Sequence, residues 1–181
     1  RSSSAASDVY KRQSLYRLDI LGKNSIDLIL NKNDIDILVQ LTEGSFTSSI
    51  EGSYDTDILI GLGKKITDYR NEVRELNRSF FDANEERDLQ KINSIREEAS
   101  FKQNQFQLSL KEYLNKSNNS LAVLMASSST YLPIGENISF WENIYNRYYD
   151  EFNQNTYFQK FENDLIKLKA VSVGSIAPDI I

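Results

Sequence analysis

Carboxylate pairs are the first residues in this sequence whose type and spacing could do chemistry. They occur at Asp34 and Asp36, at Asp55 and Asp57, and at Glu97 and Glu98. Neighbouring carboxylates can bind a divalent cation, but none of these pairs has the turn glycine and downstream glutamate of a calcium loop. Asp34 and Asp36 fall on one side of a predicted strand. They therefore indicate either a solvated strand face or a weak cation site.

Hydroxyl and phosphate-binding groups are the next candidates. Residues 127–130 read Ser-Ser-Ser-Thr, but the chain has no histidine that could serve as a base, and it has no cysteine. This composition excludes thiol catalysis, disulfides, histidine acid–base catalysis and the usual zinc sites from this chain. Residues 61–65, Gly-Leu-Gly-Lys-Lys, lack the full spacing of a phosphate-binding loop. We therefore predict no catalytic residue, no cofactor-binding residue and no metal ligand.

The charge balance argues against nucleic acid as a partner. The chain has 21 basic and 26 acidic residues and a net charge of -5, whereas nucleic-acid binding requires a basic surface. No apolar run approaches the length that crosses a bilayer. We expect membrane contact only through an anchor in a missing N-terminal segment.

The first part of the chain has the period of two that is typical of half-buried strands. The predicted strands cover residues 16–20, 26–30, 35–41 and 46–50. We expect residues 26–30 and 35–41 to form an antiparallel hairpin. Four strands are too few to close a sandwich, so the sheet is expected to be a remnant with an exposed edge.

At Asp55 or Thr56 the period changes to three and four. The stripe predicts a long helix that ends near Asp82, with Asp55 as its cap, and a second helix from Asn84, interrupted at Lys102 or Gln103. The stripe residues are Leu59, Leu62, Ile66, Tyr69, Val73, Leu76 and Phe80, then Leu89, Ile92, Ile95, Ala99, Phe106, Leu110 and Tyr113. So short a connection predicts an antiparallel helical hairpin. Charged residues between Arg70 and Lys102 indicate solvated faces or, alternatively, a charged binding face.

Three shorter helices are predicted after the hairpin. Residues 118–120 cap an apolar helix over residues 121–126, and Pro133 to Glu136 form a break. An aromatic helix over residues 140–152 and a last helix over residues 157–168 follow. Aromatic side chains at helical spacing in an acidic chain favour a packed core over a surface that stacks bases or sugars.

The two ends carry sequences that resemble known segments. Residues 3–13, Ser-Ser-Ala-Ala-Ser-Asp-Val-Tyr-Lys-Arg-Gln, resemble a translated sequencing-library adapter, so we exclude residues 1–13 from the fold and expect them to be disordered. Residues 173–180, Val-Gly-Ser-Ile-Ala-Pro-Asp-Ile, resemble the G-x-x-A-P-[DN]-F start of thioredoxin-like domains in peroxiredoxins and envelope thiol-disulfide reductases. Ile180 stands where that family usually has Phe.

The order of strands, the Gly52-Ser53 junction, the helical region and this last segment resembles the N-terminal accessory region of a TlpA-like thiol-disulfide oxidoreductase. The resemblance implies an α+β fold: residues 14–53 are a partial antiparallel β domain, 54–170 a mostly helical region and 171–181 the start of a truncated thioredoxin-like domain. It also implies a parent protein that reduces or isomerises disulfides, or acts as a peroxidase, in the cell envelope or periplasm. No catalytic residue carries over, because the family's Cys-x-x-Cys lies downstream of Ile181.

The implied partners are the thioredoxin-like domain downstream in the same chain and envelope proteins with disulfides. On this reading the fragment is inactive and positions the redox domain. The alternative is a stand-alone helical-hairpin interaction module without enzymatic activity. We expect such a module to be monodisperse, whereas a truncated fragment with an open sheet should associate.

Overall fold

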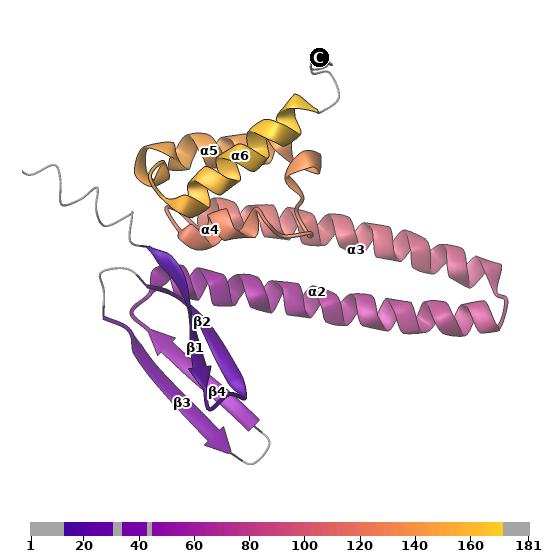
Figure 1. Ribbon diagram of the computed structural model, residues 1–181. Helices are drawn as coiled ribbons and strands as arrows, with labels where there is room; N and C mark the ends of the chain where they lie inside the picture. The colour runs from indigo at the N-terminus through magenta and orange to yellow at the C-terminus, as the bar shows by residue number, and fades with distance from the viewer. Residues whose placement is uncertain (1–12, 31–33, 43–44, 172–181) are drawn as a thin grey trace, which may run out of the picture. The chain divides into compact units, whose positions relative to one another are not determined.

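The computed structural model describes residues 13–30, 34–42 and 45–171. Strands come first and helices follow (Figure 1), which confirms the predicted α+β class. The chain divides into two compact units, one made of Arg1–Leu59 with Ser117–Ile181 and the other of Ile60–Lys116. Residues 172–181, which carry most of the thioredoxin-like segment, and residues 1–12 of the adapter-like segment lie outside the described residues.

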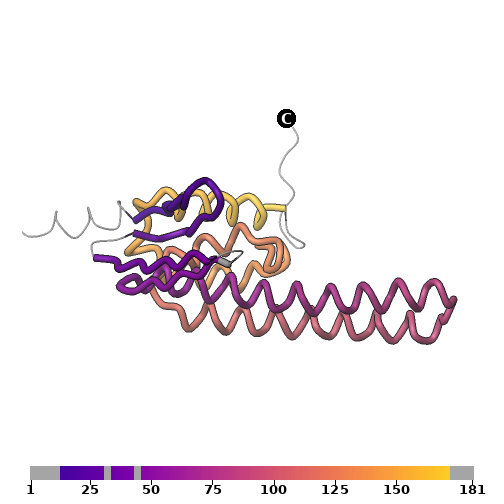
Figure 2. The backbone as a smooth tube through the Cα atoms, turned by 90° about the horizontal axis from the view of Figure 1, so that it is seen from below, coloured from indigo at the N-terminus to yellow at the C-terminus, as the bar shows by residue number. Residues whose placement is uncertain are grey.

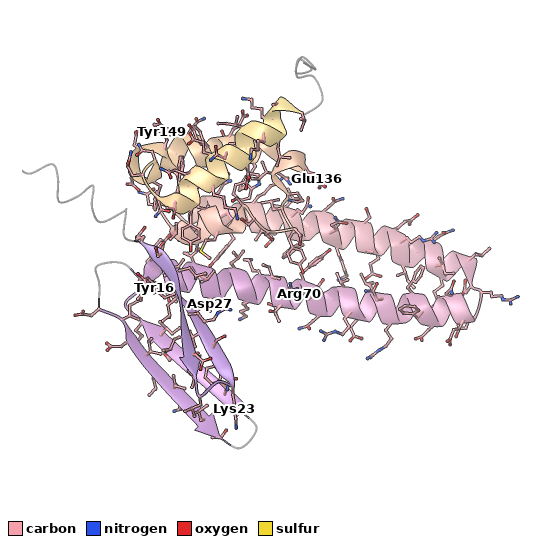
Figure 3. The ribbon with its side chains drawn as sticks, viewed as in Figure 1. Tyr16, Lys23, Asp27, Arg70, Glu136 and Tyr149 are labelled. Carbon is pink, nitrogen blue, oxygen red and sulfur yellow. The ribbon has the colours of Figure 1, made fainter. Side chains whose placement is uncertain are left out.

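The first hairpin joins β1 (Ser14–Ile20) to β2 (Asn24–Leu30) in an antiparallel pair. Tyr16 lies opposite Leu28, and the Arg17 guanidinium pairs with the Asp27 carboxylate at 2.6 Å (Figure 3). The chain reverses at Leu21 and Gly22, whose φ angles of 56° and 65° are both positive. Positive φ at both central residues is the geometry whose twist matches a tight hairpin.

The second hairpin pairs β3 (Asp36–Thr42) with β4 (Ser45–Glu51). The predicted hairpin between residues 26–30 and 35–41 is therefore wrong, because residues 24–30 pair with 14–20 and residues 36–42 with 45–51. Alternating hydrophobicity reports which face of a strand is buried but not which strand is its neighbour. Each strand pairs with its neighbour in sequence instead, and the short turn at residues 21–23 lets β1 and β2 meet directly.

Two long helices, α2 (Tyr54–Glu85) and α3 (Leu89–Lys116), form the predicted antiparallel hairpin. Within the unit Ile60–Lys116 they run side by side (Figures 1 and 2). The core at one end of the hairpin contains Ala83, Ile92 and Ile95, with Leu76 and Phe80 packed against them. Lys102, the predicted interruption of the stripe, pairs with Glu72 at 3.0 Å.

The predicted ends of the helices need correction. Ser53, not Asp55, caps α2, because its hydroxyl accepts from the Thr56 amide at 3.1 Å. The helix passes Asn84, where the second helix was expected to begin, and runs to Glu85. The chain then turns at Arg87, whose φ of 56° lets the Asp88 amide reach the Ala83 carbonyl at 2.9 Å.

Three helices and one short 3-10 turn complete the unit that contains the strands. They are α4 (Leu121–Ala126), η1 (Ile134–Glu136), α5 (Ile138–Phe152) and α6 (Thr156–Ala170). Ser120 caps α4, as predicted, by accepting from the Ala122 amide at 3.2 Å. The aromatic residues of α5 and α6 form a packed core, also as predicted; Trp141, Tyr148, Phe152, Phe158 and Phe161 are fully buried. Ile166 and Leu168 of the predicted stripe are exposed instead.

One residue of the excluded N-terminal segment belongs to this core. Gln13 is only 6% exposed, and its backbone carbonyl accepts from the Asn155 side chain at 3.2 Å. The expectation of disorder for residues 1–13 is therefore wrong at its last position. The resemblance of this segment to an adapter does not indicate which of its residues packs against the rest of the protein.

Candidate functional site

A buried polar network surrounds the first turn of α2. The Asp55 carboxylate is 3% exposed and accepts from the Leu121 amide at 2.8 Å and from the Gln13 side chain at 3.3 Å. This carboxylate therefore stabilises the start of α4, because it pairs with an amide that a helix leaves unpaired. Both hydrogen bonds join it to groups of the protein itself, so Asp55 has a structural role at this position.

The same turn of α2 also binds the last part of β2. The Thr56 hydroxyl accepts from the Ile29 amide at 3.0 Å, and the Ser53 hydroxyl donates to the Ile29 carbonyl at 2.8 Å. Both hydroxyls are buried. Side-chain groups at the start of α2 thus satisfy the backbone amide and carbonyl of Ile29. The β1–β2 hairpin is in this way joined to α2 without a continuous sheet.

Tyr148 makes the corresponding connection from α5. Its hydroxyl donates to the Ser117 carbonyl at 2.7 Å and accepts from the Ser120 amide at 3.2 Å. Burial raises the pKa of this phenol, so the group stays neutral and keeps its donor. The arrangement supports the segment that leads into α4.

The residues that the sequence analysis considered for chemistry are not brought together. Asp34, Asp36 and Asp57 are exposed, as are Glu97 and Glu98 on α3. In the described part of the chain, no group of three or more acidic side chains is placed to hold a metal ion. Ser127 donates to the Leu124 carbonyl at 2.6 Å, and Ser129 accepts from the Tyr131 amide at 3.2 Å. These hydroxyls complete local turns.

The glycine-lysine segment 61–65 lies inside α2 and forms no loop. Gly61 has a packing role, because a Cβ at this position would overlap the Tyr113 hydroxyl on α3. The neighbouring Lys65 ammonium lies 5.4 Å from the centre of the Tyr113 ring and 3.0 Å from the Ser109 hydroxyl. Residues 61–65, which lack the full spacing of a phosphate-binding loop, are thus part of a helix.

Two surface grooves were not predicted, because no sequence pattern marks a groove between helices. The first, of about 350 Å³, lies between α2 and α3 and contains the stacked rings of Tyr69 and Phe106, whose centres are 4.1 Å apart. Charged side chains from both helices form its rims. It is lined by Lys65, Asp68, Tyr69, Glu72, Phe101, Lys102, Gln105, Phe106 and Ser109.

The second groove, of about 430 Å³, lies between α5 and α6. Its lining includes Glu142, which pairs with Lys169, and Tyr145, whose hydroxyl donates to the Glu162 carboxylate at 2.8 Å. This hydrogen bond, with smaller contributions from burial and nearby negative charge, raises the pKa of Tyr145 to about 12. Tyr145 therefore remains protonated at neutral pH and is unsuited to act as a general base.

Comparison with protein-family models, curated proteins and solved structures finds no match to this chain. None of the helices in the described ranges combines the length and the apolar character needed to cross a bilayer. The site geometry must therefore carry the functional argument by itself. It offers two grooves and a structural polar network.

Proposed function

We propose that this chain is the non-catalytic N-terminal region of a cell-envelope thiol-disulfide oxidoreductase, where it positions the redox domain that follows or that domain's protein partners. The observation that carries the proposal is the attachment of α6. Phe158, Phe161 and Leu165 bury one face of this helix in the aromatic core. The pairing of Lys169 with Glu142 extends the attachment to the last turn. A domain that begins in the segment after α6 would thus be held by a fixed helix.

The composition of the chain is consistent with a positioning role for these residues and thiol chemistry in another part of the protein. It contains no cysteine, so a dithiol would have to come from another part of the protein. There a cysteine of low pKa at a helix N-terminus would attack a partner disulfide, and a second cysteine would resolve the mixed disulfide. The role of the present residues would be to orient that domain, which affects selectivity and not the thiol chemistry.

The direct test is to recover the nucleotide sequence downstream of Ile181 by long-read sequencing of the same source. The proposal expects a strand followed by Cys-x-x-Cys at the start of a helix. A stop codon immediately after Ile181 would contradict it. If the dithiol is present, the redox domain should then be prepared with and without residues 14–170.

The comparison of these two proteins tests the positioning role. Without residues 14–170, the redox domain should reduce a small disulfide at an unchanged rate, because its dithiol is intact, but lose its selectivity among protein disulfides. Equal selectivity with and without these residues would refute positioning. The small-disulfide assay is the control for correct folding of the redox domain.

The second candidate function is a stand-alone interaction module. It is favoured by the α2–α3 hairpin, which is a compact unit of its own and exposes large apolar side chains. Phe81, Leu89, Phe101 and Leu108 are each more than 60% exposed. A natural stop codon after Ile181 would favour this function over the first, because the hairpin would then be the main functional surface.

A further inference from the structure

The middle of the α2–α3 hairpin is its least buried part. The buried residues of α3 are Ile92 and Ile95 near its start and Leu110 and Leu114 near its end, with none between them. The groove between α2 and α3 occupies this middle section. Two helices that meet along one stripe leave such a groove partly open, and packing of further helices against it is the usual way to cover it.

Phe101 is an exposed aromatic side chain at the edge of this groove. It lines the groove and is nevertheless 62% exposed. The stacked rings of Tyr69 and Phe106 line the same groove. An exposed ring and an aromatic groove therefore lie on one face of the hairpin, and a two-fold rotation can place the ring of each copy against the groove of the other.

The charges on the α2 rim have the same self-complementarity. Lys65 and Glu72 lie seven residues apart, which is about 10 Å along a helix and places them on one side of α2 at opposite ends of the rim. If two copies of α2 run antiparallel about the middle of the rim, Lys65 of each copy comes beside Glu72 of the other. Asp68 lies at the centre and approaches its own counterpart.

We propose that this face pairs with a second copy of the same chain, with a two-fold axis across the groove and each Phe101 seated in the groove of the other copy. The four charges on the rims, Lys65, Lys102, Asp68 and Glu72, sum to zero. A phosphate-rich partner is therefore disfavoured, whereas a copy with the same alternation of charge fits. The proposal is independent of the function proposed above.

The interface is small, so the dimer should be weak. The groove and its rims belong to the lower size class of protein interfaces, below about 1,200 Å². We expect a dissociation constant in the range of micromolar or weaker. Sedimentation equilibrium over a concentration series, from about 1 µM to 1 mM around that range, measures it for the full chain.

A pair of charge-reversal variants tests the geometry. Lys65→Glu makes the rim acidic at both ends, and Glu72→Lys makes it basic at both ends. Each variant alone should dimerise at least about tenfold more weakly, because like charges then meet at both ends of the interface. Glu72→Lys also removes the ion pair with Lys102 of the same chain, so recovery of dimerisation in the mixture is the decisive result. A mixture of the two variants should form a heterodimer. At one end of its interface the introduced Glu of the first variant meets the introduced Lys of the second. At the other end the unchanged Glu72 of the first variant meets the unchanged Lys65 of the second. Native mass spectrometry distinguishes this heterodimer from either homodimer.

Matched controls separate this interface from other modes of association. Lys64→Glu makes the same charge change at an exposed neighbouring residue that does not line the groove, so it should leave dimerisation unchanged. Asp68→Asn should tighten the dimer, because it removes the like charges at the axis. Circular dichroism confirms that each variant keeps its helices.

Three results would overturn the proposal. They are a wild-type chain that stays monomeric throughout the concentration series, a mixture that behaves as its separate components, and a Lys64→Glu variant that is impaired as much as Lys65→Glu. Association through exposed strand edges would leave Lys64→Glu and Lys65→Glu equally unaffected, because such edges do not depend on charges of the hairpin.

Discussion

Removal of the Tyr148 hydroxyl should destabilise the unit that contains the strands. Tyr148→Phe keeps the ring, which is fully buried, and deletes the two hydrogen bonds to the Ser117 carbonyl and the Ser120 amide. The Ser120 amide would lose this acceptor in a position that is 0% exposed, at a cost of about 1–3 kcal/mol. The Ser117 carbonyl would lose a donor, at a cost of about 1 kcal/mol. The expected total is about 2–4 kcal/mol.

The assay is urea unfolding followed by the fluorescence of Trp141. This is the only tryptophan of the chain and is fully buried in α5, so its signal reports the unit in question. For a chain of this length, the expected loss corresponds to a decrease in Tm of roughly 5–15 °C. The slope of the free energy of unfolding against urea should stay constant, because the surface exposed on unfolding does not change.

Tyr149→Phe is the matched control, because Tyr149 is the next residue of the same helix and is 44% exposed (Figure 3). Its effect should stay within about 0.5 kcal/mol. Two results would contradict this expectation: equal losses of stability in the two variants, or a loss of less than about 1 kcal/mol in Tyr148→Phe. Either result would mean that other groups satisfy the Ser120 amide.

The pH dependence supplies a second measurement on the same group. Burial raises the pKa of Tyr148 above its ordinary value of 10.0. As the pH rises through 10, the unfolded chain therefore releases this proton before the folded chain does. The contribution of Tyr148 to the free energy of unfolding should be constant below that pH and should decrease above it. Tyr148→Phe should show a weaker decrease than Tyr149→Phe.

Four further substitutions have defined outcomes. Gly52→Ala should lower Tm by an amount equivalent to about 1–3 kcal/mol, because φ is 94° there and a Cβ would overlap the Asp34 carbonyl; Gly63→Ala, which has open space in α2, should instead raise Tm. Leu21→Asn should increase the free energy of unfolding by roughly 0.5–1 kcal/mol, because Leu21 has a φ of 56° and is 79% exposed. A lower free energy of unfolding, measured by urea denaturation, would contradict this. In a spectrophotometric titration, Tyr145→Phe should remove a tyrosine that ionises near pH 12, and removal of one that ionises near 10 would show that its carboxylate bond is absent in solution.

Much of the secondary structure was predictable because periodicity is a local property. The change from a period of two to a period of three and four located the boundary between strands and helices close to Tyr54. The aromatic spacing of α5 and α6 predicted the buried face, as Trp141, Phe152 and Phe161 confirm. Such patterns are reliable here because one face of each element must leave water wherever the element lies.

The boundaries and partners were less predictable because they depend on distant or single groups. Ser53 and Asp55 are both good capping residues, and the contacts of Ser53 with the Thr56 amide and of Asp55 with the Leu121 amide decide their roles. Leu89 has the right spacing for the α3 stripe but is 73% exposed. The turn at Arg87 that follows α2 requires a left-handed residue where no glycine announces it.

By itself, the sequence determined the class of the fold, the sidedness of its elements and the absence of cysteine and histidine chemistry, since these follow from composition and from the spacing of apolar residues along the chain. Only the tertiary structure decided which polar side chains complete the backbone of β2 and α4, and where grooves form. These depend on residues such as Ile29 with Thr56 and Asp55 with Leu121, which are far apart in the chain. Hydrogen bonds and packing over such separations depend on how the elements are arranged in space. A periodic pattern describes only neighbouring residues and does not predict that arrangement.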